Sequence, residues 1–351
     1  VGSGNSGAGG ELVLSAGTSS GTTGGRLSVV SGLGLHTSGS LLLRTANAGS
    51  SGVSGQLVLS TGTASKGNSG ALYISSGTAM SGRGGAVYVT VGSGNSGAGG
   101  ELVLSSGASS TESGGRLSVV SGSGLKRSGA VLVASGYNPD RDSGSVSLLT
   151  SDAGSSGVSG QIIFSTGVSN NGNSGSIDIG SGKATSGRGG AVYVTVGSGN
   201  SGAGGELVLS AGTSSGTTGG RLSVVSGVGV KTSGALMLLT ADAGAAGVSG
   251  EIVLSTGTAG QGNSGALYIG SGTATSGRGG AVYVTVGSGN SGAGGELVLS
   301  SGASADESGG RLSVVSGVGL KTSGSLLLRT ANSGSSGVSG QLVLSTGTAS
   351  K

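Results

Sequence analysis

Short aliphatic stretches recur along this chain at intervals of about 15 residues, and each is followed by small polar residues and glycine. The first three stretches are Glu11–Ser15, Arg26–Val30 and Ser40–Arg44. From Glu11 onward there are 23 such units without a break. A chain that repeats one short element is typical of a stacked or fibrous structural protein rather than of an enzyme.

Hydrophobic and polar positions alternate within each aliphatic stretch. When a unit is numbered from the first residue of its stretch, positions 2 and 4 are aliphatic or Phe in all 23 units. This alternation has the period of a β-strand, so we expect both positions to face one interior as two continuous ladders. The predicted core ladder begins with Leu12, Leu14, Leu27, Val29, Leu41, Leu43, Leu57, Leu59, Leu72, Ile74, Val87 and Val89.

The units group into a longer repeat. Six units form a super-repeat of about 90 residues, in which the second unit is one residue shorter and the third one residue longer than the others. The super-repeats are 11–100, 101–205, 206–295 and a partial one at 296–351, and the second holds one extra unit, Ala130–Gly144. We expect residues 1–351 to be a single continuous array, cut at both ends from a longer chain.

The extra unit predicts the size of a coil. It adds one unit of the usual length, and the pattern resumes afterwards in the same phase. Such an insertion is tolerated most easily if each unit is one complete coil. The predicted fold is therefore all-β, a β-solenoid with about one coil per 15 residues, six coils per super-repeat and about 4.8 Å between coils.

Composition narrows the class further. Glycine accounts for 85 of 351 residues, but it keeps a fixed phase relative to the aliphatic stretches, unlike glycine in a flexible linker. The single proline, Pro139, argues against collagen. No apolar run is long enough to span a membrane. A net charge of +4 without a basic cluster argues against nucleic acid as a partner, and the absence of cysteine removes disulfides and thiolate chemistry.

Position 3 should face outward, yet it is often apolar. A strand that is apolar on both faces is usually covered on both. We therefore expect a lateral contact with a second copy of the chain or with another segment, whereas the alternative is an exposed sheet that merely favours β-forming residues. The lateral-contact residues are Val13, Leu42, Val58, Tyr73, Tyr88, Tyr193, Tyr268 and Tyr283.

Position 1 carries opposite charges in successive units. The pairs are Glu11/Arg26, Glu101/Arg116, Glu206/Arg221 and Glu296/Arg311. On adjacent rungs they would attract by a few tenths of a kcal/mol to about 1 kcal/mol and set the register.

Catalytic, cofactor and metal sites are not predicted, and an enzyme is not expected. Each position-1 Glu has an Arg rather than a second acid beside it, which argues against a carboxylate pair. His36 is the only histidine, so no triad or His cluster can form. Gly2–Gly7 match the motif G-x-G-x-x-G, but a dinucleotide site requires a helix directly after this motif, and none is expected here. The many Ser and Thr are candidate acceptors of O-linked sugars.

The strings "VGSGNSGAGGELVLS", "GGRLSVVSG", "TANAGSSGVSGQLVLSTGTAS" and "SGRGGAVYVTV" resemble giant Gly/Ser-rich repeat proteins, β-solenoid-like, of the surface of algae and related protists. The resemblance implies an extracellular or cell-surface structural role. We therefore predict a self-associating extracellular filament. The alternatives are an ice-binding solenoid, indicated by Thr18, Thr63 and Thr78, and the stalk or spacer of an adhesin.

Overall fold

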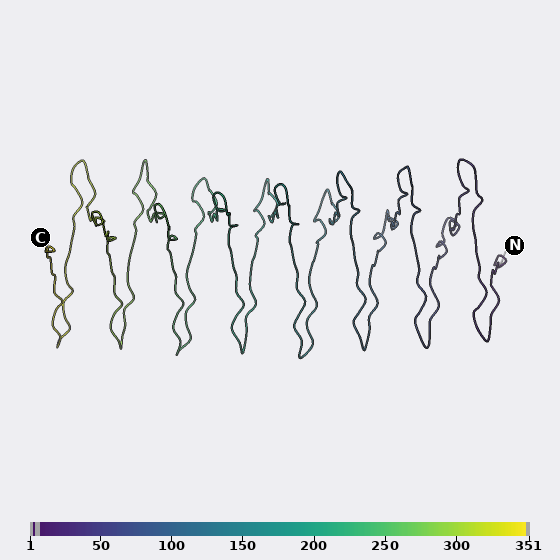
Figure 1. The fold of residues 1–351 in the computed structure, drawn as a ribbon, viewed down its shortest axis with the longest axis horizontal. Coiled ribbons are helices and arrows are strands. Elements are labelled where there is room, and N and C mark those ends of the chain that lie inside the picture. The colour runs from purple at the N-terminus through teal and green to yellow at the C-terminus, as the bar shows by residue number, and fades with distance from the viewer. Residues whose placement is uncertain (1–2, 4–7, 349–351) are drawn as a thin grey trace. The chain divides into compact units, whose positions relative to one another are not determined.

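The structure, a computed structural model, describes residue 3 and residues 8–348. Extended stretches and bends alternate along this part of the chain (Figure 1). There are 22 bends, one in each complete unit, and each starts nine or ten residues after the first residue of its unit. Ser20–Thr22 form the first bend and Ser65–Gly67 the fourth. The described residues contain neither a helix nor a β-strand.

Each bend belongs to a loop whose two ends meet. In the first loop, the amide of Gly25 donates to the carbonyl of Gly17 at 2.7 Å. In other loops a hydroxyl closes the ends, as where Ser76 Oγ donates to the carbonyl of Gly85 at 2.9 Å. We call the sixth residue of a unit and the glycine that precedes the next unit the neck. Each neck separates one closed loop from the two aliphatic segments that precede and follow it in the chain.

The necks are the most tightly packed points of the described chain. Only eight residues there are half-buried, and all eight are sixth residues of their units: Ala16, Ser31, Thr45, Ser121, Thr150, Ser226, Thr240 and Ser316. The other neck residue is glycine in all 22 units that close a loop. A Cβ on Gly25 would lie 3.0 Å from the Gly17 nitrogen and 3.2 Å from the Ala16 Cβ. Glycine is therefore required at this neck because its partner approaches so closely.

Differences in unit length are absorbed by the loops. The shorter unit, Arg26–Gly39, closes between Gly32 and Gly39, one residue closer along the chain than Gly17 and Gly25. The longer unit, Ser40–Gly55, adds a tight turn, in which the Gly52 amide donates to Gly49 at 3.5 Å. The aliphatic segments keep five residues in every case, so the phase of the pattern is preserved.

The predicted fold class, an all-β solenoid with one coil per unit, is wrong for the described residues. A solenoid needs backbone ladders between successive coils, but no strand pairing joins the segments described here. The larger part of each unit forms a locally closed loop instead of wrapping around an interior. The extra unit Ala130–Gly144 closes its own loop, from the Gly144 amide to the Gly136 carbonyl at 3.4 Å. Local closure thus explains why a single unit can be inserted.

The chain divides into two compact units, Val1–Ile179 and Gly180–Lys351. The boundary falls inside the repeat that begins at Ser176, just before the neck of Ser181 and Gly190. Each compact unit is built from the same segments, necks and loops.

Candidate functional site

The necks determine which segment residues can face each other. A Cβ on Gly85 would lie 3.2 Å from the Ser76 Cβ, so these two positions are opposite. Moving away from the loop along both segments, position 3 of one unit lies opposite position 3 of the next unit. Position 2 of the first unit likewise lies opposite position 4 of the next. The corresponding close pairs are Gly70 with Thr61 and Gly280 with Ser271, and they give the same register. Sequence analysis missed this register because the pairing is set by the neck and not by unit boundaries.

The predicted core-ladder residues do not enclose an interior. Leu57, Leu72 and Val87 are 52–54% exposed, and Leu12 and Ile74 are 70% or more exposed. No residue is buried anywhere in the described part of the chain. The narrow dry interior that the solenoid required is therefore absent from the described part of the chain.

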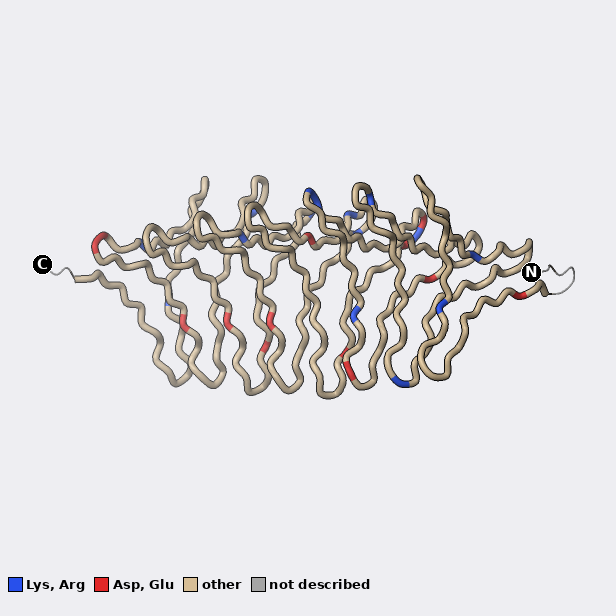
Figure 2. The backbone as a smooth tube through the Cα atoms, turned by 45° about the vertical axis from the view of Figure 1, so that its right-hand side comes forward, with Lys and Arg blue, Asp and Glu red and all other residues tan. Residues whose placement is uncertain are grey.

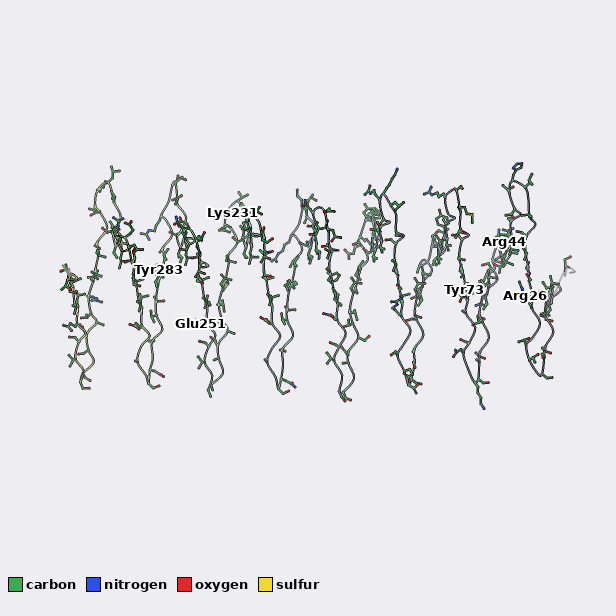
Figure 3. All side chains as sticks on the ribbon, viewed as in Figure 1. Arg26, Arg44, Tyr73, Lys231, Glu251 and Tyr283 are labelled. Atoms are coloured by element: carbon green, nitrogen blue, oxygen red, sulfur yellow. The ribbon has the colours of Figure 1, made fainter. Side chains whose placement is uncertain are left out.

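Seven of the eight predicted lateral-contact residues are more exposed than the ladder residues on either side of them, and Val13, at 69% against 70% for Leu12, is the exception. Tyr73 and Tyr88 are 89% and 86% exposed, and Tyr268 and Tyr283 are 91% and 87% exposed. Figure 3 labels Tyr73 and Tyr283 on their segments. Their position-2 neighbours are 52–56% exposed, so the two faces of a segment differ. Position 3 is thus the face more open to a partner. Val13, Leu42, Val58 and Tyr193 are also exposed.

The necks do not bring together the predicted ladder ion pairs. Arg26 directly follows the neck glycine Gly25, whereas Glu11 lies five residues before Ala16 on the other side. Extended chain advances about 3.3 Å per residue, so Glu11 lies on the order of 15 Å from the neck. The same spacing separates Glu101 from Arg116, Glu206 from Arg221 and Glu296 from Arg311. Pairing of these charges therefore requires contacts other than the necks, and it stays a prediction.

Charged residues are sparse and both signs are interspersed along the backbone (Figure 2). Several of them lie in loops: His36 is in the second bend, Lys126 and Arg127 are in or beside the eighth, and Glu307 ends a later one. The described residues form no pocket, and they hold no group of His, Asp and Glu that could bind a metal ion. The G-x-G-x-x-G motif is explained by the loops. The later copies of G-x-G-x-x-G close on themselves, as when the Gly100 amide donates to Gly92 at 3.1 Å.

The copy of that motif at Gly2–Gly7 lies outside the described residues, apart from Ser3. Thr18, Thr63 and Thr78, which indicated ice binding, lie in three separate loops, each two residues after a neck residue. They do not share one extended segment, so a flat threonine array is not formed by any single segment.

Comparisons of the chain with models of protein families, with curated proteins and with solved structures found no match. The resemblance to giant Gly/Ser-rich surface proteins therefore stays a prediction. Within the described residues, no helix has the length and apolar character needed to cross a membrane.

Proposed function

We propose that the protein is structural and that its chains associate with one another, through their aliphatic segments, into an extracellular or cell-surface filament. The observation that carries the proposal is the exposure of aliphatic side chains in every segment. Apolar area costs about 25 cal/mol per Å² when it stays in water. A regular series of such segments favours a partner with the same spacing, and a second copy of the chain has that spacing.

The total surface supports association. The chain has a mass of 32.1 kDa and an accessible surface of 34840 Å². A folded monomer of this mass would expose about 12,000 Å², and its unfolded chain about 47,000 Å². The single chain thus removes about a quarter of its surface from water, whereas folded proteins of this size remove about three quarters. Contacts between chains would supply the missing burial.

The backbone of the segments also supports association. The backbone hydrogen bonds of the described part that lie outside regular secondary structure all join glycines of the loops. Amide and carbonyl groups of an extended segment are a template for another chain when they have no partner. With only 30 charged side chains in 351 residues, few long charged groups would hold two chains apart. The sequence resemblance supports a setting outside the cell, which labelling of intact cells with an antibody would test.

A pair of matched variants tests the proposal. Leu57→Asp with Leu59→Asp places two charges in one segment, and Thr63→Asp with Ser65→Asp places the same two charges in the following loop. Burial of each leucine is worth about 1.5–3 kcal/mol, so the segment variant should assemble at a markedly higher protein concentration than the unmodified chain. The loop variant should assemble like the unmodified chain.

Assembly would be followed by sedimentation velocity and by electron microscopy of the pellet. A chain that stays monomeric over the whole concentration range would refute the proposal. Equal weakening by the segment variant and the loop variant would refute the role of the segments.

A further inference from the structure

The necks place tyrosines in equivalent positions on neighbouring segments. Tyr73 lies three residues before the neck residue Ser76, and Tyr88 lies three residues after the neck glycine Gly85. Tyr268 and Tyr283 lie equally far from the neck of Ser271 and Gly280. Ser271 Oγ donates to the Gly280 carbonyl at 2.8 Å, as Ser76 Oγ does to Gly85 at 2.9 Å. The two pairs are therefore repeats of one arrangement.

Both rings of a pair belong to the same face. Side chains alternate along an extended segment, and three steps separate each ring from a neck position that is opposite its partner. A Cβ on Gly280 would lie 3.1 Å from the Ser271 Cβ, so these two positions are opposite each other and set the register of the two segments. All four tyrosine residues are at least 86% exposed, so a soluble oxidant can reach them.

We propose that Tyr73 and Tyr88, and likewise Tyr268 and Tyr283, are sites of oxidative coupling that join two neighbouring segments of one chain covalently. The co-reactant is hydrogen peroxide with a peroxidase. Each phenol loses one electron and its hydroxyl proton, and the two electrons and two protons reduce one peroxide to two molecules of water. The resulting radicals form a carbon–carbon bond between the ring positions next to the oxygens. The hydrogens on those carbons then move to the oxygens, so the product has two hydrogens fewer than the two tyrosines.

Covalent links between tyrosines would stabilise a chain of this composition. Cysteine is absent, so disulfides cannot stabilise a chain whose described part has no buried core. The segments on the two sides of a neck share no further backbone hydrogen bond among those found in the described residues, so they are free to close until the rings touch. A bond between them would fix the necks of Ser76 with Gly85 and of Ser271 with Gly280 as permanent junctions. This inference concerns one chain alone and does not depend on filament formation.

Trypsin allows a direct test because it separates all six tyrosines. Cleavage after Lys and Arg gives peptides 67–83, 84–116, 128–141, 189–221, 232–278 and 279–311, each with one tyrosine. The full chain would be treated with peroxidase and peroxide at a concentration where sedimentation shows monomers. We expect conjugates of 67–83 with 84–116, and of 232–278 with 279–311, each two hydrogens lighter than its two peptides. Oxidation of Met80 or Met237 adds oxygen and is therefore distinguished by mass.

Tyr137 and Tyr193 are internal controls. Tyr137 lies in a loop, and the position that corresponds to a partner of Tyr193 in the sequence pattern holds Asp178. Both should remain uncoupled. Conjugates spread evenly over the six peptides would overturn the proposal.

Short separation along the chain would also favour coupling of Tyr73 to Tyr88 in a random coil, so a second variant is needed. The exchange Tyr88→Val with Val89→Tyr keeps composition and moves the ring by one residue to the opposite face. If the neck sets the register, the conjugate of 67–83 with 84–116 falls to the background level of the Tyr137 conjugates. The conjugate of 232–278 with 279–311 stays unchanged. An undiminished yield of the first conjugate would show that proximity in sequence is sufficient, and it would overturn the proposal.

Discussion

The neck glycine offers the sharpest test of the architecture. Gly25→Ala with Gly220→Ala would place a methyl group in two loops of identical sequence, each against its neck partner. The added carbon would lie 3.0 Å from the Gly17 nitrogen in the first loop and 3.1 Å from the Gly212 nitrogen in the second. Gly24→Ala with Gly219→Ala is the matched control, because the nearest atom would be a carbonyl oxygen at the ordinary distance of 3.7 Å in both loops.

The expected magnitude follows from the neck geometry. Unstrained contacts of carbon begin at about 3.5 Å, so the neck must widen by roughly 0.5 Å. The hydrogen bond from the Gly25 amide to Gly17, 2.7 Å long, would then reach the upper limit of the usual range. A typical hydrogen bond contributes about 0.5–1.5 kcal/mol net. The substitution should therefore destabilise the closed neck by about 1 kcal/mol, which is roughly a fivefold decrease in the ratio of closed to open necks.

Amide hydrogen exchange at residues 25 and 220 measures this ratio when it is compared with an unstructured reference peptide. We expect about fivefold lower protection for the Gly25 and Gly220 pair of substitutions. The control pair should keep its protection or gain some, because replacing glycine by alanine restricts the open chain. Equal protection in both pairs would refute the claim that glycine is required by the closeness of its neck partner.

Two further predictions concern other loops. Ser76→Ala should remove the 2.9 Å hydrogen bond from the hydroxyl to the Gly85 carbonyl and weaken that neck. Ser76→Thr should retain the bond, since Thr61 makes the same bond to Gly70 at 3.1 Å. The NMR chemical shift of the Gly85 carbonyl carbon distinguishes the two variants, and identical shifts would contradict the hydrogen bond. Gly67→Ala should strain the fourth bend by about 1–2 kcal/mol, because Gly67 has a φ of 101°. Gly62→Ala, in the same loop and with open space around its added carbon, should not. Equal amide exchange of the loop in both variants would argue against strain at Gly67.

The repeat unit and its alternating segment were readable from the residues, but the way a unit closes was not. Hydrophobic alternation at Leu12, Leu14 and their counterparts identifies an extended segment, and this does not depend on what covers it. The solenoid prediction added the assumption that each unit turns once around an interior. The decisive contact is short-range, between Ala16 and Gly25 in the first unit, and it involves two small residues with no hydrophobic signature. Patterns of apolar residues cannot indicate a contact of that kind.

One sequence signal could have identified the necks. Glycine immediately precedes the next aliphatic segment in all 22 complete units, while the seventh position is glycine in 18 of them and the residues between these two positions vary. An invariant glycine next to a variable stretch indicates a close approach of backbone rather than a flexible joint. The paired tyrosines could also have been recognised as lying symmetrically outside a neck, had the partner of the neck glycine, the sixth residue of the unit, been known.

The shorter and longer units show why closure at the neck is the more economical explanation of the pattern. If each unit were a coil, a change of one residue would alter the perimeter and displace the ladder of that coil relative to its neighbours. In the observed arrangement the change lies between Ser31 and Gly39, or between Thr45 and Gly55, and the segments on both sides are unaffected. A Cβ on Gly39 would still lie 3.5 Å from the Ser31 Cβ, and a Cβ on Gly55 would lie 3.4 Å from the Thr45 Cβ. Variation in loop length therefore leaves every segment with the same register across its neck, which is the property that an array of laterally associating segments needs.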